Sequence, residues 1–270
     1  MKLYRHLGAV AQARAMRTMR TILSVVFVIA LSACAGGAHT HYIRGSLDVH
    51  SFTRGLANVH VVVQGSNAFM FDSGYEANAA ELEQDLRAAG VDPAQLKAII
   101  VSHGHADHAG GAKYFHDRFK VPVFIGDGDQ GMYTTGKHDQ PLCPTGLIGR
   151  LRHGQDQSAT YTGSLPDRVI STQTDLKDLT GIDGKVVPLP GHTRGTLVVV
   201  VADIVLVGDL LLGSVLGSGA TTHLFMCDLD ANRRDIAHLM KDLAPNATSV
   251  FTGHFSPVGR ESVLKNFDVR

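Results

Sequence analysis

Short runs of apolar residues alternate with polar, glycine-rich connections along most of this chain. Runs rich in Val, Ile and Phe predict buried strands, and apolar residues spaced three or four apart predict helices. Strands followed by helices in each half predict one α/β domain built from two halves packed sheet against sheet. We expect strands at 57–63, 68–71, 98–101, 121–125, 185–189, 196–201, 204–207 and 248–251, and helices at 78–89, 109–119, 233–243 and 257–267.

One long segment, residues 126–167, breaks this alternation. It is rich in Gly, Asp, Gln, Thr and Pro and shows little periodicity. Connections of this length are either lids and binding loops or excursions over the surface. The sequence leaves both possibilities open.

The first 33 residues have the pattern of an export signal. They contain five basic residues and no acidic one, and the apolar run at 22–31 is too short to span a bilayer. The run leads into Leu31-Ser32-Ala33-Cys34, which resembles the lipobox of bacterial lipoproteins, where the Cys becomes the acylated first residue. We expect a lipid anchor at Cys34 in the bacterial cell envelope, facing the periplasm and with the outer membrane favoured. An ordinary signal peptide is the alternative, and translation can start at Met1, Met16 or Met19.

After the export signal we expect a tether and N-terminal segment over 34–56 and a single domain over 57–270. The sequence is 44% hydrophobic, which is enough for a buried core. Without the export signal, 20 basic residues remain beside 25 acidic ones, so a nucleic-acid partner is disfavoured and a small-molecule substrate is expected. Cys143 and Cys227 either pair in an oxidising compartment or stay separate as buried thiols.

Three histidines and an aspartate lie close together directly after the predicted strand at 98–101. They are His103, His105, Asp107 and His108. Neutral imidazole and carboxylate are ligands that zinc prefers in proteins. Residues i and i+2 of an extended segment point to the same side, so His103 and His105 can bind one ion. A turn then directs Asp107 and His108 towards a second.

Four other residues of the same chemistry also follow apolar strands. Asp72, His192, Asp209 and His254 each come directly after such a run. Each one alone is an ordinary loop residue. Together with the 103–108 cluster they predict a metal centre built from the ends of several strands.

The motifs HADHAGG, PGHTRGTL, GD and TGH resemble those of the metallo-β-lactamase fold superfamily over about residues 57–256. The resemblance implies a four-layer αββα sandwich with two metal ions at one edge of its sheets. One ion would be bound by His103, His105 and His192, the other by Asp107, His108 and His254, with Asp209 bridging them. Asp72 would orient the ring of a ligand through the ring N–H.

The same resemblance implies a zinc hydrolase, since the iron relatives carry a carboxylate at the position of His105. Metal-bound hydroxide would attack a carbonyl carbon while Asp107 orients it and relays its proton. Asp209 stands where the family's β-lactamases carry Cys or Ser, so the resemblance favours the glyoxalase II and lactonase branches, which cleave thioesters and lactones. β-Lactam hydrolysis and a non-catalytic metal-binding envelope lipoprotein are the alternatives. His223 and Tyr133 either line the pocket or only pack in the fold.

Overall fold

Two mixed β-sheets form the framework of this computed structural model, which describes residues 37–214, 217 and 219–269. Residues 39–270 group into one unit by their contacts. The predicted export signal and Cys34 lie outside the described residues. Within those residues, no helix is long and apolar enough to cross a bilayer.

The first sheet has seven strands paired in chain order. They are β1 (Ala38–Arg44), β2 (Leu47–Arg54), β3 (Ala57–Gln64), β4 (Asn67–Phe71), β5 (Ile99–Ile100), β6 (Val123–Gly126) and β7 (Arg168–Ile170). β2, β3 and β4 pair antiparallel, whereas β4, β5 and β6 are parallel. The carboxyl ends of β4, β5 and β6 therefore meet at one edge of the sheet.

The second sheet has six strands in the order β13-β12-β11-β10-β9-β8. Their bounds are β8 (Thr174–Asp175), β9 (Lys185–Pro188), β10 (Leu197–Val201), β11 (Ile204–Leu206), β12 (Ser249–Phe251) and β13 (Val258–Gly259). β10 runs antiparallel to both β9 and β11, and β11 is parallel to β12. The carboxyl ends of β9, β11 and β12 thus lie at a common edge as well.

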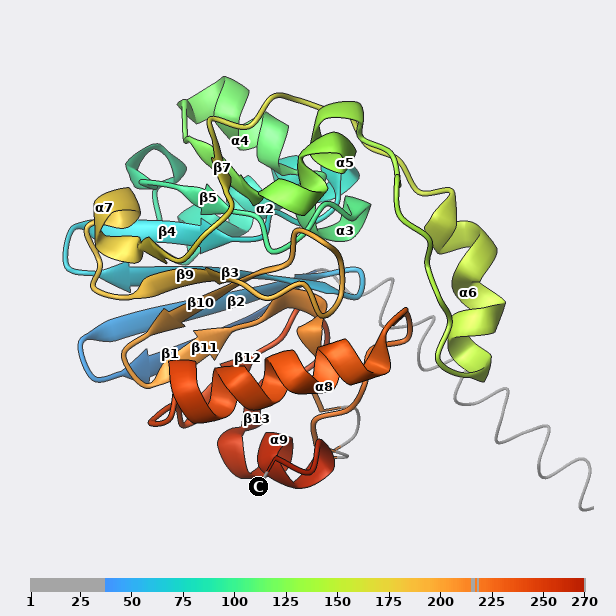
Figure 1. Ribbon diagram of the computed structural model, residues 1–270. Helices are drawn as coiled ribbons and strands as arrows, with labels where there is room; N and C mark the ends of the chain where they lie inside the picture. The colour runs from blue at the N-terminus through green and yellow to red at the C-terminus, as the bar shows by residue number, and fades with distance from the viewer. Residues whose placement is uncertain (1–36, 215–216, 218, 270) are drawn as a thin grey trace, which may run out of the picture. The chain divides into compact units, whose positions relative to one another are not determined.

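Helices cover the outer faces of both sheets (Figure 1). The α-helices are α2 (Ala79–Ala88), α3 (Ala106–Ala109), α4 (Ala112–Phe119), α5 (Gln130–Thr135), α6 (Leu147–Gln157), α7 (Leu176–Thr180), α8 (Leu229–His238) and α9 (Arg260–Asn266). Short 3₁₀ turns lie at Glu76–Asn78, Pro93–Gln95, Asp127–Asp129 and Gly208–Leu210, and α8 continues into one π turn at Leu239–Leu243.

Buried apolar side chains fill three layers between these elements. Phe71 and Val199 belong to the cluster between the two sheets. Phe115 of α4 packs on the outer face of the first sheet, and Ile236 of α8 packs on the outer face of the second. Burial of apolar surface on both faces of each sheet stabilises this four-layer order. The predicted αββα fold is confirmed.

Most predicted elements are present within a few residues, and the exceptions have local causes. The helix expected at 109–119 is divided into α3 and α4 at Gly110 and Gly111, because the backbone of 73–76 packs against both glycines and leaves no room for a Cβ. The helix expected at 257–267 starts later, after β13. β1 starts at Ala38, inside the predicted tether, and the 38–54 hairpin was not predicted because its polar side chains hide the strand pattern.

Candidate metal centre

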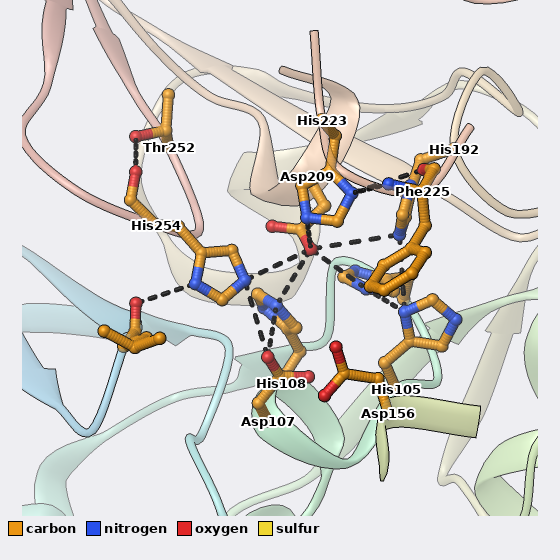
Figure 2. Close-up of polar contacts among 12 residues, drawn as sticks. His105, Asp107, His108, Asp156, His192, Asp209, His223, Phe225, Thr252 and His254 are labelled. Carbon is orange, nitrogen blue, oxygen red and sulfur yellow. Dashed lines mark hydrogen bonds and ion pairs between the residues drawn. The ribbon is translucent and has the colours of Figure 1, made fainter. Parts of the chain in front are cut away.

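Every sequence-predicted ligand lies just beyond the carboxyl end of a strand, in the loop, turn or short helix that follows it. The 103–108 segment follows β5 and runs into α3, His192 follows β9, Asp209 lies in the turn after β11, and His254 follows β12. Because these strand ends share an edge, the loops converge there. The structure brings all seven candidate ligands into one cluster, in which Figure 2 shows Asp209 among the histidines.

Three imidazoles form the first group of candidate ligands. His103 Nε2 lies 2.9 Å from His105 Nδ1, and His192 Nε2 lies 3.3 Å from the same atom. Burial lowers the pKa values of all three rings, so they are neutral near pH 7. Neutral rings present lone pairs, which is the form that binds a metal ion.

The second group contains Asp107, His108 and His254. Asp107 Oδ2 lies 3.7 Å from His108 Nε2 and 3.4 Å from His254 Nε2. Burial lowers the pKa of His108, but Asp209, Asp107 and Asp72 outweigh it and raise that pKa well above its usual value. The surplus of negative charge on this side favours a bound cation.

Asp209 lies between the two groups. Its Oδ2 atom is 3.8 Å from His103 Nε2 in the first group and 3.3 Å from His254 Nε2 in the second. Its Oδ1 atom is buried without a hydrogen-bond partner. Although burial raises the pKa of Asp209, His223, His254 and His108 hold it well below its usual range. A single ionised carboxylate therefore faces both groups.

Asp72 orients the 103–108 loop from outside the cluster. Its carboxylate accepts hydrogen bonds from Ser102 N–H at 2.7 Å, from Ser102 Oγ at 2.9 Å and from His108 Nδ1 at 2.9 Å. The bond to His108 fixes the proton on Nδ1 and leaves Nε2 facing the centre, as ligand histidines require. Asp72 itself has a φ of 64° directly after β4.

Asp129, which the sequence analysis did not single out, joins the two loops of the first group. The buried carboxylate accepts hydrogen bonds from Gly104 N–H at 2.9 Å, Thr193 Oγ1 at 2.6 Å and Gly195 N–H at 2.9 Å. Burial raises the pKa of Asp129, and these donors oppose the rise. The loop that carries His105 is thereby fixed against the loop that carries His192.

Two further side chains that the sequence did not reveal hold the loop of His254. Asn58 Nδ2 donates to the carbonyl oxygens of Thr252 and Phe255 at 2.9 and 2.7 Å, and His60 Nε2 donates to Thr252 O at 3.0 Å. Both residues lie on β3 of the first sheet. They connect the two sheets directly beneath the centre.

His223 also lies in the centre. Its Nε2 is 3.0 Å from Asp209 Oδ2, closer than the nitrogen atoms of His103, His108, His192 and His254, and the residue is 5% exposed. Phe225 N–H donates to His223 Nδ1 at 3.2 Å. Of the two residues left open, His223 therefore reaches the site, whereas Tyr133 packs in the core against Tyr161.

A disulfide links the long 126–167 segment to the irregular segment that carries His223. Cys143 and Cys227 are bonded, with their Cα atoms 4.9 Å apart, which resolves the pairing that the sequence left open. Met226 N–H donates to Cys143 O and Thr145 Oγ1 donates to His223 O, at 2.8 and 2.7 Å. These contacts fix the position of His223.

An open cavity of about 320 Å³ adjoins the first group. Its lining combines apolar groups with one exposed cation, Arg194, and two carboxylates, Asp139 and Asp228. It also includes His105, His192, Leu142, Phe225 and the Cys143–Cys227 bridge. The 126–167 segment thus supplies part of the wall. A small molecule placed here would meet the centre from the side of His105 and His192.

The residues fit bound metal ions. His105 Nε2, His108 Nε2 and Asp209 Oδ1 are buried in the cluster without a hydrogen-bond partner. Orphaned buried atoms of this kind are costly unless a ligand satisfies them. Four overlapping groups of three His and Asp side chains, two of which include Asp209, offer donor sets that suit metal ions.

Known proteins share these features. A family model described as the Metallo-beta-lactamase superfamily matches residues 52–255. The chain is 29% identical over 185 residues to the probable metallo-hydrolase YflN of Bacillus subtilis (strain 168), an alignment that covers 61% of this chain and 62% of that protein. It is 27% identical over 129 residues to the hydroxyacylglutathione hydrolase GloC of Haemophilus influenzae, covering 48% and 53% of the two chains.

The fold is also shared with solved structures. The crystal structure of MIM-1, described as a metallo-β-lactamase from Novosphingobium pentaromativorans, superposes with a TM-score of 0.58. The match covers 83% of this chain and 82% of that one at 18% identity. At this level of identity the likeness concerns the fold.

Proposed function

Because the chain belongs to the metallo-β-lactamase superfamily, we propose that it is a metal-dependent hydrolase that cleaves an acyl bond of a small molecule, such as a thioester or lactone. The observation that carries this proposal is the position of Asp209, whose Oδ2 atom faces histidines of both groups. The similarity to GloC, a hydroxyacylglutathione hydrolase, supports the thioester class.

Two zinc ions are the proposed cofactors. His103, His105 and His192 would hold one, Asp107, His108 and His254 would hold the other, and Asp209 would be shared. When bound, zinc supplies a Lewis acid that polarises a carbonyl oxygen and lowers the pKa of water towards neutrality.

The chain's own residues complete the chemistry. Asp107 is the one partly exposed carboxylate among the candidate ligands, with 22% of its side chain accessible. It is placed to accept the proton that the attacking water loses and to pass it to the leaving group. His223 donates from Nε2 to Asp209 and holds that carboxylate in position. Arg194 and Phe225 line the cavity where the substrate would bind.

The proposal is tested by metal analysis and a substrate panel. Purified protein is stripped with a chelator, reloaded with zinc, and assayed with chromogenic thioester, lactone, ester and cephalosporin substrates. We expect two zinc ions per chain and zinc-dependent cleavage of a thioester or lactone. Cephalosporin cleavage alone would replace the proposal with β-lactam hydrolysis. Metal binding with no cleavage would favour a binding protein.

We also propose that the protein is exported and anchored to the bacterial envelope through an acyl group on Cys34. Support comes from the basic residues before the apolar run at 22–31 and from the Leu31-Ser32-Ala33-Cys34 sequence. Mass spectrometry of the mature N-terminus is expected to find Cys34 as the acylated first residue. An unmodified N-terminus at another position would contradict this.

A further inference from the structure

Helix α6 carries an unusual concentration of exposed apolar side chains. Leu147, Ile148 and Leu151 are 73%, 60% and 77% exposed, and Leu165, on the segment that returns from the helix, is 73% exposed. Among the described residues, only two other large apolar side chains are exposed, Ile43 and Leu229. Figure 1 shows α6 at the side of the sandwich, beyond α3. Contiguous exposure of this kind marks an interaction surface.

The helix is polar on its inner face and apolar on its outer face. A side chain at Gly149 would collide with the carbonyl oxygen of Leu224, so this face packs against the fold. Arg152 and Asp156, one turn further along, pair on the inner side with an Nη2–Oδ1 distance of 2.8 Å. Leu147 and Leu151 are one turn apart on the opposite side. This is the reverse of the usual arrangement, in which a surface helix packs its apolar face on the fold. No described part of the fold covers the apolar stripe of α6.

The inner face of α6 lies close to the metal centre. Figure 2 places Asp156 beside Asp107 and His105. Burial raises the pKa of Tyr75, and Asp107, Arg152 and Asp156 are among the charges that act on it. A partner bound to the outer face of α6 would therefore be separated from the centre by the helix.

The outer face combines apolar residues with positive charge. Arg150 is exposed beside Leu151, and the helix's one acidic residue, Asp156, is turned inward. An apolar stripe flanked by arginine, without carboxylates, suits the interface of a bilayer that contains anionic lipids. A protein partner would not require this charge.

The strand order places the start of the fold at the same edge as the metal centre. β1 and β2 form a hairpin across Gly45 and Ser46, so β1 runs opposite to β2 and to the parallel strands β4 and β5. The chain therefore enters β1 from the edge where those strands end. Cys34 is five residues before His39 and can reach no farther than about 18 Å from it. The proposed acyl group on Cys34 would then hold the bilayer within that reach of the start of β1.

We propose that α6 lies on the surface of the bilayer, with Leu147, Ile148 and Leu151 at the acyl boundary and Arg150 among the lipid headgroups. The proposal builds on the proposed anchor at Cys34 and is independent of the reaction that the centre performs. In this orientation the cluster of candidate ligands faces the bilayer, and α6 lies between the cluster and the lipid.

The absence of tryptophan from the sequence allows a direct test. The full chain carrying Leu151→Trp is reconstituted into vesicles of phosphatidylcholine and phosphatidylglycerol with brominated acyl chains, which quench a nearby indole. We expect a blue shift and about a twofold loss of emission, because an interfacial helix buries its apolar face at the acyl boundary. Ile43→Trp, at a position that is 67% exposed on β1, is the matched control and should keep its emission.

Equal emission from both variants with and without brominated lipid would overturn the proposal. A blue shift of Leu151→Trp that rises with protein concentration in the absence of vesicles would also overturn it and would assign the stripe to a second copy of this chain. Should Leu151→Trp not fold, Ile148→Trp reports on the same face. Metal content and cleavage of the substrate panel described above are measured on the same samples, so a chain that cleaves none of these substrates but has a quenched indole rejects the hydrolase and retains the membrane contact. Cys34→Ser tests the anchor separately.

Discussion

The loops of the metal centre and helix α6 both lie outside the sheets, yet they are built on opposite principles. The loops are polar and buried, and hydrogen bonds between them hold them in position: Asp129 alone accepts from both loops of the first group. α6 is regular in backbone, yet Gly149 is its one fully buried residue. The irregular loops of the metal centre are thus held more firmly on the fold than the regular helix α6. Cross-loop hydrogen bonds, not secondary structure, determine where rigidity lies in this molecule.

The largest effect is expected at the centre, from Asp209→Asn. Asparagine keeps the shape and removes the charge that faces both groups, so at least one zinc should be lost. Loss of several kcal/mol of transition-state stabilisation corresponds to about a 10³-fold fall in kcat/KM. Metal analysis and turnover of the preferred substrate measure this. Asp183→Asn, at a side chain that is 84% exposed, is the control and should change neither. Full metal content in Asp209→Asn would contradict the shared-carboxylate role.

A smaller effect is expected from acid, acting on His60 beneath the centre. Burial lowers the pKa of His60 to about 4, against 6.5 for the free side chain. The unfolded chain therefore binds the proton more readily, and stability is lost as the pH falls from 6.5 towards 4. Between pH 7 and pH 5 this amounts to about 2 kcal/mol.

Urea unfolding of the metal-free protein at the two pH values measures this loss. His60→Gln keeps a donor for Thr252 O but cannot titrate. Between pH 7 and pH 5 its free energy of unfolding should therefore fall by about 2 kcal/mol less than that of the unsubstituted protein. An identical fall in both proteins would show that another group governs the response to acid.

The smallest effect is expected on α6. Replacing Leu147 or Leu151 by Ser removes apolar area that is already exposed, so the free energy of unfolding should change by less than about 0.5 kcal/mol each. Ile100→Ala, a fully buried position between the sheets, should cost about 2–5 kcal/mol and serves as the contrast. Urea unfolding at pH 7 compares the three. A large loss from the α6 changes would mean that the helix packs on the fold through this face.

The sequence predicted the fold and the ligand candidates for physical reasons that the structure makes plain. Strands buried on both faces, such as 196–201, leave unbroken runs of Val, and H-x-H-x-D-H concentrates its chemistry within six positions. Each signal is local. A centre assembled from such motifs can be anticipated even though its loops lie far apart in the chain.

The residues that support the centre gave no such signal. Asn58, His60 and Asp129 act through bonds to loops dozens to nearly two hundred positions away, and His223 sits in an irregular stretch after Asp209. A single buried polar side chain has no periodicity to detect. The hairpin 38–54 was not predicted for a related reason, because β1 exposes its histidines and shows no alternation of apolar and polar residues.

The Cys143–Cys227 bond also affects how the molecule would respond to a break in its backbone. The 84-position span that it closes contains α6, His192, Asp209 and His223, whereas the 103–108 motif lies outside. Proteolytic nicking within exposed α6 would leave two pieces still joined covalently, each bringing part of the ligand set. Such a cut would become visible by electrophoresis after reduction, and the nicked protein would retain both halves of its coordination sphere.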